Sequence, residues 1–417
     1  MVKQRLPEDQ EAFGAAPHER SVPRISIHAF CEFPDTGAAL QKAGADRRLA
    51  KAHLSVQLGG IAAAVERYDG QVTPNLLILE TRLSGRAALE ELDRLAEVCD
   101  PATKVIVIGR ANDVELYREL IRRGASEYLV APVDPMHLIE VIAGLYSDPQ
   151  GRPIGRIIAF IGARGGAGSS TLAHNVGWCI AEEQHINTTI VDFDLPFGTV
   201  GLDFNDEPGQ GVADALSAPE RLDDVLMDRL LMKRGEFLSL FTAPATLDRD
   251  YDAAVDAYET VLDAVRQVTP CVVVDLPHHW APWVKATLIG ADDIVVVATP
   301  DLASLRNTKN LMELLKQNRP NDTAPKLILN QVGQPKRPEI PLKDFAETIG
   351  AEPVAQLGFD PLLFGTAANN GQMLAETGQK SPSVAAMRHL ANLLTGRKPA
   401  VKAARPLFSL LQGRKRA

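Results

Sequence analysis

The stretch FIGARGGAGSSTLAHN, residues 160–175, has the frame of a phosphate-binding loop but lacks its lysine. A P-loop has the pattern G-x-x-x-x-G-K-[ST], and its lysine reaches the terminal phosphates of a nucleotide. The apolar run Ile157–Ile161 predicts a strand, the glycines predict a turn, and Ser169-Ser170-Thr171 predict the start of a helix. Ser169 stands where the lysine belongs. The stretch therefore predicts a nucleotide loop and leaves open whether the loop supports hydrolysis.

The composition is that of a globular protein with room for two or three domains. The chain has 417 residues, of which 45% are hydrophobic. Its net charge of −9 disfavours general nucleic-acid binding, which needs a basic face. The polar N-terminus lacks the apolar core of a signal peptide, and no apolar run reaches the roughly 18 residues of a membrane span. We expect a cytoplasmic protein whose four cysteines are reduced core thiols: Cys31, Cys99, Cys179 and Cys271.

Short apolar strands alternate with helices over residues 24–146, which predicts a parallel sheet with helices on both faces. The predicted strands are RISIHAF, NLLILET, KVIVIG and EYLVAP, and the predicted helices lie near 49–67, 86–98, 113–123 and 135–146. The polar residues 1–23 are predicted to be disordered. The turn-rich residues 147–155 are the best candidate for a linker.

The pattern over residues 24–146 resembles a response-regulator receiver domain of flavodoxin-like fold, most clearly at GASEYLVAPVDPMHL. The resemblance implies an acidic pair after the first strand, an acceptor aspartate after the third and a lysine before the proline that follows the fifth. The chain instead has His28 and Ala29, Glu80, and Ala131 at these places. We therefore predict an atypical receiver-like domain that accepts no phosphoryl group and serves docking or dimerisation. Glu80 alone is weak evidence for permanent mimicry of a phosphorylated aspartate.

A second α/β unit is predicted over residues 156–395. Its strands are RIIAFIG, TTIVDFD, FLSLFTA, CVVVDLP, DIVVVATP, KLILNQVG and PVAQLGFD. The glycine loop, the Asp192-x-Asp194 pair and Asp275 each follow or end one of these strands. Open α/β sheets bind ligands at the carboxyl ends of their strands. Three polar motifs at one such edge therefore predict a binding site there.

The loop from Arg164 to Thr171 resembles the deviant Walker A loop of the MinD/ParA group of P-loop ATPases. Backbone N–H groups of such a loop and the dipole of the following helix cradle phosphates. The resemblance implies ATP and Mg²⁺ as cofactors, with these roles. The implied phosphate-binding residues are Gly165, Gly166, Ala167, Gly168, Ser169, Ser170 and Thr171. Mg²⁺ would be held by Ser170, Asp194 and Asp275, and Asp194 would also orient water. Asn330 would read adenine, and the base would be covered by Phe359, Asp360 and Pro361.

The pair His278-His279 beside Trp280 admits two interpretations. Two adjacent histidines suggest a metal site, but a zinc site needs further ligands at suitable spacing, and none is apparent. A surface loop after Asp275 is the better interpretation.

The segments LGFDPLLFGTAANNGQMLAE, residues 357–376, and GGAGSSTLAHN narrow the resemblance. Together they resemble the pilus-assembly proteins of the tight-adherence (Flp/Tad, or Cpa) secretion system, the CpaE/TadZ group. The resemblance covers about residues 24–395 and implies a receiver-like domain followed by a MinD-like ATPase domain. It also implies a cytoplasmic localisation factor, polar or peripheral to the membrane, that recruits the secretion ATPase and inner-membrane platform of a pilus.

Loss of the loop lysine predicts slow or absent hydrolysis, since electrostatic stabilisation is the main catalytic effect in phosphoryl transfer. Arg164 holds the position of the other lysine of the MinD/ParA group, which reaches across a nucleotide-sandwiched dimer. Arginine keeps the positive charge and offers two donors to a phosphate. We therefore predict an ATP-dependent homodimer in which Arg164 clamps the partner's phosphates.

The C-terminal residues 396–417 form a predicted basic tail. From Thr377 onward the sequence has nine basic residues and no acidic one. Leu407, Phe408, Leu410 and Leu411 precede the basic end, so the tail either contacts a membrane surface or is a disordered tail with one apolar patch. The second interpretation is slightly favoured, because the apolar part is short.

Two other functions stay open. The first is a ParA-like partitioning ATPase acting on DNA, which Ser169 and the acidic balance disfavour. The second is a phosphorelay output protein, which the altered receiver pocket disfavours.

Overall fold

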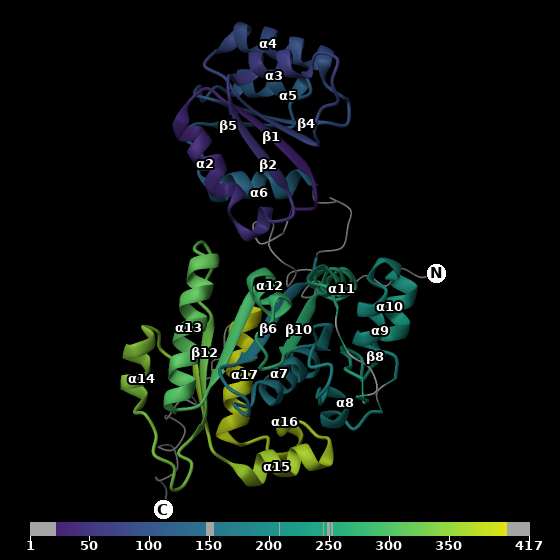
Figure 1. The fold of residues 1–417 in the computed structure, drawn as a ribbon, viewed down its shortest axis with the longest axis vertical. Coiled ribbons are helices and arrows are strands. Elements are labelled where there is room, and N and C mark those ends of the chain that lie inside the picture. Colours follow the sequence, from purple (N-terminus) through teal and green to yellow (C-terminus); the bar gives the residue numbers. More distant parts are fainter. Residues whose placement is uncertain are drawn as a thin grey trace, which may run out of the picture.

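The computed structural model of the chain describes residues 22–146, 154–207, 209–244, 246–247, 251 and 253–397. These residues form two α/β domains, one above the other along the long axis of the molecule (Figure 1). Residues 1–21, 147–153 and 398–417, which carry most of the predicted arm, linker and tail, lie outside the described residues. In the described part of the chain, no helix is both long and apolar enough to span a membrane.

The N-terminal domain is a five-stranded parallel sheet with the order β2-β1-β3-β4-β5, the order of flavodoxin-like folds. Its strands are β1 (Ser26–Cys31), β2 (His53–Leu58), β3 (Leu76–Glu80), β4 (Lys104–Gly109) and β5 (Glu127–Val130). Its helices are α2 (Pro34–Gly44), the 3₁₀ turn η2 (Arg47–Leu49), α3 (Gly60–Tyr68), α4 (Gly85–Val98), α5 (Val114–Arg122) and α6 (Pro135–Tyr146). α2 and α6 cover one face, and α3, α4 and α5 cover the other.

The prediction of a helix near residues 49–67 is wrong for the first half of that range. His53–Leu58 form the edge strand β2, and the helix α3 begins only at Gly60. The apolar residues of HLSVQL alternate with polar ones, which is the period of a half-buried strand. The helix α2, which connects β1 to the edge strand and packs against one face of both strands, was not predicted.

The C-terminal domain has an eight-stranded sheet of order β13-β12-β11-β6-β10-β7-β9-β8. Its strands are β6 (Arg156–Gly162), β7 (Thr188–Asp192), β8 (Met232–Lys233), β9 (Leu238–Phe241), β10 (Cys271–Leu276), β11 (Asp293–Ala298), β12 (Lys326–Val332) and β13 (Ala355–Gly358). The seven predicted strands are present and parallel. β8, which pairs antiparallel with β9 at the edge, was not predicted.

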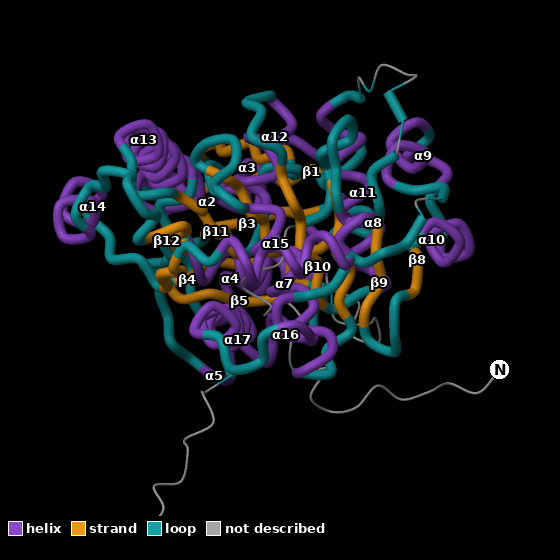
Figure 2. The backbone as a smooth tube through the Cα atoms, turned by 90° about the horizontal axis from the view of Figure 1, so that it is seen from below, coloured by secondary structure: helices purple, strands orange, loops and turns teal. Residues whose placement is uncertain are grey.

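Helices cover both faces of this sheet (Figure 2). They are α7 (Ser169–Trp178) with its π-helical extension η3 (Cys179–Glu183), α8 (Val200–Asp203), α9 (Val212–Ser217), η4 (Pro219–Arg221), α10 (Asp224–Leu230), α11 (Val255–Val268), α12 (Pro282–Gly290), α13 (Leu302–Asn318), α14 (Leu342–Ile349), α15 (Pro361–Asn370), α16 (Leu374–Thr377) and α17 (Pro382–Thr395). The central strand β6 lies between β10 and β11, and almost all of its residues are buried. Continuous apolar runs are typical of such doubly covered parallel strands.

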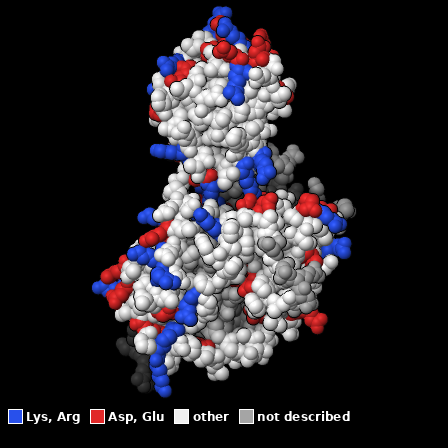
Figure 3. Space-filling view, viewed as in Figure 1, with Lys and Arg blue, Asp and Glu red and all other residues white. Residues whose placement is uncertain are grey.

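The two domains meet at the amino-terminal edge of the eight-stranded sheet. There Nη1 of Arg47, in η2, donates to the carbonyl oxygen of Gly290 at the end of α12 (3.2 Å). On the face shown in Figure 3, basic and acidic side chains lie together at this narrow junction. The glycine loop and α15 lie at the opposite end of the C-terminal domain (Figure 1).

Candidate nucleotide site

The glycine loop joins β6 to α7, as the sequence predicted. Gly166 and Gly168 have left-handed backbone angles, φ +73° and +89°, which side chains other than that of glycine rarely adopt. A Cβ atom at Gly168 would also lie 2.4 Å from Nδ2 of Asn330. Gly168 caps α7, so the loop delivers the chain into the N-terminus of a helix, where backbone N–H groups and the helix dipole favour an anion.

The end of β12 supports the loop from the other side. Nδ2 of Asn330 donates to the carbonyl oxygen of Ala167 (2.8 Å), and Nε2 of Gln331 donates to that of Gly166 (2.8 Å). Asn330, which the sequence analysis assigned to adenine, therefore uses its amide N–H to hold the loop. Gln331 was not predicted to take part.

A pocket of about 400 Å³ joins the loop to the segment before α15. Seven of its lining residues are predicted site residues: Gly166, Gly168, Thr171, Asn330, Phe359, Asp360 and Pro361. Gln331, Gln334, Gly358 and Phe364 complete the lining. The lining offers amide side chains, two phenylalanine rings and glycine backbone, which are groups that can contact a nucleotide. The volume lies in the usual range for small-molecule sites.

Ser169 is buried at the start of α7, and its Oγ has no hydrogen-bond partner among the described residues. It does not line the pocket, and neither do Gly165, Ala167 and Ser170. The side chain that replaces the lysine is thus too short and too deeply placed to meet a ligand in that pocket.

Three carboxylates lie behind the loop, at the ends of β7 and β10. Asp192 is buried and accepts hydrogen bonds from the backbone N–H groups of Asp194 (3.0 Å) and Val200 (3.2 Å). Burial and the nearby charge of Asp275 raise the pKa of Asp192 to about 7. Burial also raises the pKa of Asp194, although the Phe197 N–H opposes this rise. The three predicted motifs therefore meet at one edge of the sheet.

The residues fit Mg²⁺ as part of a nucleotide complex. Asp275 is 1% exposed, and its Oδ1 has no hydrogen-bond partner among the described residues. Mg²⁺ prefers oxygen ligands and is usually held by one or two carboxylates together with phosphates and water. In the part of the chain that the structure describes, no group of three His, Cys, Asp or Glu side chains forms a complete metal cage by itself.

His174, which the sequence analysis did not single out, lies between one of these carboxylates, Asp275, and the carboxylate of Asp203. Its side chain is fully buried, with Nδ1 2.6 Å from Oδ2 of Asp203 and Nε2 3.4 Å from Oδ2 of Asp275. Burial alone would lower the pKa of His174, but the two carboxylates raise it to about 10. The signal in the sequence was a polar residue four positions after Ser170, on the same face of α7.

Arg164 is held within its own domain. Its Nη1 lies 3.1 Å from Oδ2 of Asp301, which caps α13 by accepting from the backbone N–H of Ser304. Burial would raise the pKa of Asp301, but the Ser304 N–H, Thr299 and Arg164 hold it below its usual range. The Arg164 side chain is 48% exposed, so it is accessible at the surface of the loop.

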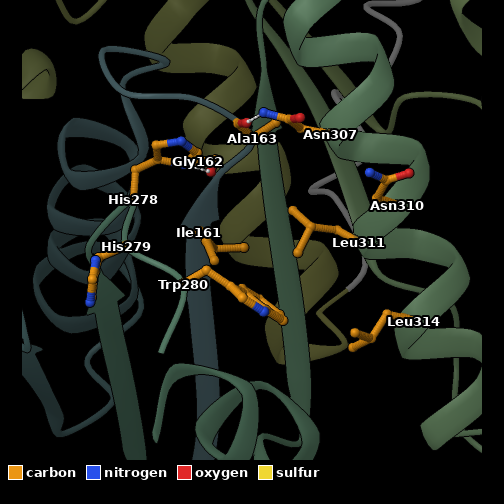
Figure 4. A pocket seen from close by; sticks show the side chains of 10 residues that line it. All are labelled: Ile161, Gly162, Ala163, His278, His279, Trp280, Asn307, Asn310, Leu311 and Leu314. Carbon is orange, nitrogen blue, oxygen red and sulfur yellow. Dashed lines mark hydrogen bonds between the residues drawn. The ribbon is translucent and has the colours of Figure 1, made fainter. Parts of the chain in front are cut away.

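The segment with His278, His279 and Trp280 lines a second pocket, of about 370 Å³, on the side of the loop that faces α13 (Figure 4). Nδ1 of His278 lies 3.0 Å from the carbonyl oxygen of Gly162, and Nδ2 of Asn307 donates to that of Ala163 (2.8 Å). His278 thus contacts the protein backbone at the end of β6.

In the N-terminal domain, Glu80 is buried at the end of β3. Its carboxylate accepts from the backbone N–H groups of Glu32 and Phe33 (2.9 Å each) and from Oγ1 of Thr36 (2.7 Å). The carboxylate therefore binds the segment that leads into α2, and it does not present a charge to solvent.

Comparison with known proteins gives the following likenesses. No family model matches the chain. The pilus assembly protein CpaE of Caulobacter crescentus is 50% identical over 31% of this chain and 98% of the CpaE chain, with a TM-score of 0.30. A ParA family ATPase of Chlorobium tepidum is 24% identical over 57% of this chain and 98% of its own, with a TM-score of 0.52.

The septum site-determining protein MinD of Pyrococcus horikoshii, solved as a complex with Mg-ADP, is 18% identical over 58% of this chain and 96% of its own, with a TM-score of 0.51. The likeness to the ParA and MinD structures establishes the fold, and the 50% identity over nearly all of the CpaE structure establishes the family. This chain belongs to the CpaE family of pilus assembly proteins, and it shares the fold of the ParA and MinD structures.

Proposed function

We propose that this protein is an ATP-binding scaffold for the assembly of a Flp-type pilus, with slow or absent ATP hydrolysis. The observation that carries the proposal is the 400 Å³ pocket, which joins the glycine loop to Asn330 and Phe359 although the loop lysine is absent. The pocket brings a glycine loop, an amide side chain and an aromatic ring together, which is the set of groups that a nucleotide site uses.

The chain's own residues supply the contacts. Backbone N–H groups of residues 165–171 and the N-terminus of α7 bind phosphates. Phe359 and Pro361, which line the same pocket as Asn330, would stack on the base. Ser170, Asp194 and Asp275 would hold Mg²⁺, which neutralises phosphate charge when it is bound.

Slow hydrolysis follows from the missing cation. A positive group aimed at the transferring phosphoryl group is worth several powers of ten in rate in related chemistry. Ser169 offers a neutral hydroxyl, and His174 lies buried behind the carboxylates. Arg164 is the remaining cation of the loop, and it is paired with Asp301.

An ATP-bound homodimer gives Arg164 a role. Two triphosphates that face each other across an interface repel unless cations lie between them. Arg164 is half exposed and anchored by one ion pair, so it can exchange Asp301 for a phosphate of the partner. A long-lived dimer in the cytoplasm, at a pole or at the membrane surface, would then recruit the secretion ATPase and the inner-membrane platform of the pilus.

The first experiment is a calorimetric titration of the full chain with ATP and Mg²⁺, followed by a phosphate-release assay. Wild-type protein should bind with one saturable site and release little phosphate. Gly168→Val should abolish binding, because its Cβ would collide with Asn330. Gly209→Val is the matched control, since Gly209 lies outside the site and a Cβ at that position meets nothing within 4 Å. Absence of saturable binding to wild-type protein would refute the proposed function.

The second experiment tests the dimer by light scattering in saturating ATP. Arg164→Ala should lower the dimer population, whereas Asp301→Asn, which frees Arg164 and keeps a helix-capping side chain, should raise it. Arg86→Ala, at a side chain 92% exposed on the N-terminal domain, serves as the charge-matched control. A monomeric wild type, or an Arg164→Ala dimer as stable as the wild-type dimer, would contradict the clamp role.

A further inference from the structure

Two neighbouring helices, α12 and α13, run from the nucleotide edge of the C-terminal domain to its contact with the N-terminal domain. In a parallel α/β sheet, each helix after a strand returns from the carboxyl edge to the amino edge. α13 has 17 residues and is therefore roughly 25 Å long. It is long enough to link the two ends of the domain.

The first turns of α13 contact the glycine loop. Asp301, its N-cap, pairs with Arg164, and Nδ2 of Asn307 donates to the carbonyl oxygen of Ala163 (2.8 Å). The segment before α12 contacts the same stretch through His278 and Gly162 (Figure 4). The start of α13 and the segment that leads into α12 therefore both contact the stretch that would receive a phosphate.

The far ends of both helices contact η2 of the N-terminal domain. Nε of Arg47 donates to Oδ2 of Asp322, just beyond α13 (2.6 Å), and Arg48 pairs with Oδ1 of the same carboxylate. Nδ2 of Asn321 donates to Oδ2 of Asp46 (2.9 Å). Arg47 also donates to the carbonyl oxygen of Gly290 at the end of α12.

These charges are almost completely buried. The side chains of Arg47, Arg48 and Asp322 are 4–5% exposed. Arg319, at the end of α13, donates to Asp322 (2.8 Å) and to the carbonyl oxygen of Leu288 in α12 (2.9 Å), so it joins the ends of the two helices. Buried ion pairs are sensitive to geometry, because a displaced charge loses both its partner and its solvent. A shift of either helix would therefore change how firmly η2 is held.

We infer that α12 and α13 couple the nucleotide loop to the N-terminal domain, so that occupation of the loop changes the contact between η2 and Asp322. The inference rests on the proposed nucleotide binding. The element with two arrangements is Arg164, which pairs either with Asp301 at the start of α13 or with phosphate. Coupling between two sites is reciprocal, so loosening η2 must also change the loop and its affinity for nucleotide.

The structure offers a matched control at the same domain contact. Lys51, two residues after η2, pairs with Asp263 of α11, and both side chains are about one-third or more exposed. Among the described residues, the side-chain hydrogen bonds and the ion pair that residues 162–164 make with other elements come from Asp301 and Asn307 and from His278 before α12, and none of them comes from α11. Lys51→Ala therefore removes an ion pair between the domains without touching the coupled helices.

The test uses the full chain and two readouts. Hydrogen exchange of peptides covering residues 160–172 is measured without nucleotide for wild type, Asp322→Asn, Asn321→Ala and Lys51→Ala, and ADP–Mg²⁺ affinity is measured by calorimetry. Asp322→Asn should speed exchange in the loop and change the ADP affinity about fivefold or more. Asn321→Ala, which keeps every charge, should act in the same direction if Asp322→Asn folds poorly. Lys51→Ala should match wild type in both readouts.

Unchanged loop exchange in both Asp322→Asn and Asn321→Ala would overturn the coupling, and so would an equal effect of Lys51→Ala. If wild-type protein binds no ADP, the proposed function fails, but the exchange measurement still decides the coupling, because it needs no ligand.

Discussion

Glu80 and Ser169 each stand at the carboxyl edge of a parallel sheet, at positions where the families that the sequence resembles carry a residue that handles phosphate. Their surroundings differ. Glu80 is satisfied by its own chain, through two backbone N–H groups and the hydroxyl of Thr36. Ser169 is buried with an unpaired Oγ, beside a pocket of about 400 Å³. At Glu80 the site is occupied by hydrogen bonds within the domain. At Ser169 the adjacent pocket remains open.

The neighbours of Glu80 strengthen this contrast. Two guanidinium groups lie over the ring of Phe33, with Cζ of Arg82 4.4 Å and Cζ of Arg110 3.9 Å from its centroid. Arg82 also pairs with Glu32 (2.5 Å). The cations at this edge are thus engaged by side chains of the domain itself, and a phosphoryl group would have to break these contacts.

The largest expected effect concerns His174, because it holds the C-terminal site together. His174→Asn would leave Asp203 and Asp275 without their shared partner, and removal of one partner from a buried ion pair costs about 3–5 kcal/mol. We expect a loss of unfolding free energy of that size in urea denaturation at pH 7. If His174→Asn has the same unfolding free energy as wild type, the contacts of His174 with Asp203 and Asp275 do not stabilise the C-terminal domain.

The difference in unfolding free energy between wild type and His174→Asn should depend on pH. The pKa of His174 is raised to about 10 in the folded state, from about 6.5 in an unfolded chain. A raised pKa means that the stabilisation is complete below about pH 6.5 and is lost as the pH rises towards 10. The difference in unfolding free energy between wild type and His174→Asn should therefore shrink from pH 6.5 to 10. A difference that stays constant across this range would contradict a buried imidazolium.

The second effect, of intermediate size, concerns Glu80. Glu80→Gln keeps the shape but replaces one acceptor oxygen with a donor that faces backbone N–H groups. Hydrogen bonds to a charged acceptor contribute about 1.5–3 kcal/mol, so we expect a loss of that size in the stability of the N-terminal domain. Glu90→Gln is the control, because Glu90 is 59% exposed and, among the described residues, its ion pair is with its helix neighbour Arg86. Equal stability of the two variants would show that the Glu80 site is not closed by its own hydrogen bonds.

The sequence predicted the C-terminal sheet better than the N-terminal one for a physical reason. Strands such as β6 and β10 are buried on both faces and therefore read as continuous apolar runs. The edge strand β2 is only partly buried, so its pattern was assigned to a helix. The glycine loop and the aspartates were predictable because each belongs to a local motif.

Residues whose partners lie far away in the sequence were not predictable. His174 lies on α7, Asp203 on α8 and Asp275 on β10, so their contacts depend on how these elements pack together. Arg47 meets Asp322, which is 275 residues away in the chain. Asn330 fits the predicted site, but its hydrogen bond to Ala167 depends on how β12 lies beside the loop. No pattern within a short window of sequence reports such contacts.

The last prediction is that a variant of Glu80 shows no phosphorylation. It tests directly whether the Glu80 site is closed while the site beside Ser169 is open. Glu80→Asp restores the residue type that accepts phosphoryl groups in receiver domains, but we expect no phosphoryl adduct after treatment with acetyl phosphate and Mg²⁺. Phosphoryl transfer depends mainly on cations that neutralise the developing charge. His28 contacts Tyr68, and Ala29 and Ala131 have no charge to offer. Intact mass spectrometry of wild type and Glu80→Asp decides the matter, with Glu80→Gln as the control for labelling elsewhere. An adduct specific to Glu80→Asp would show that the N-terminal site needed only its acceptor, and that it had stayed as open as the site around Ser169.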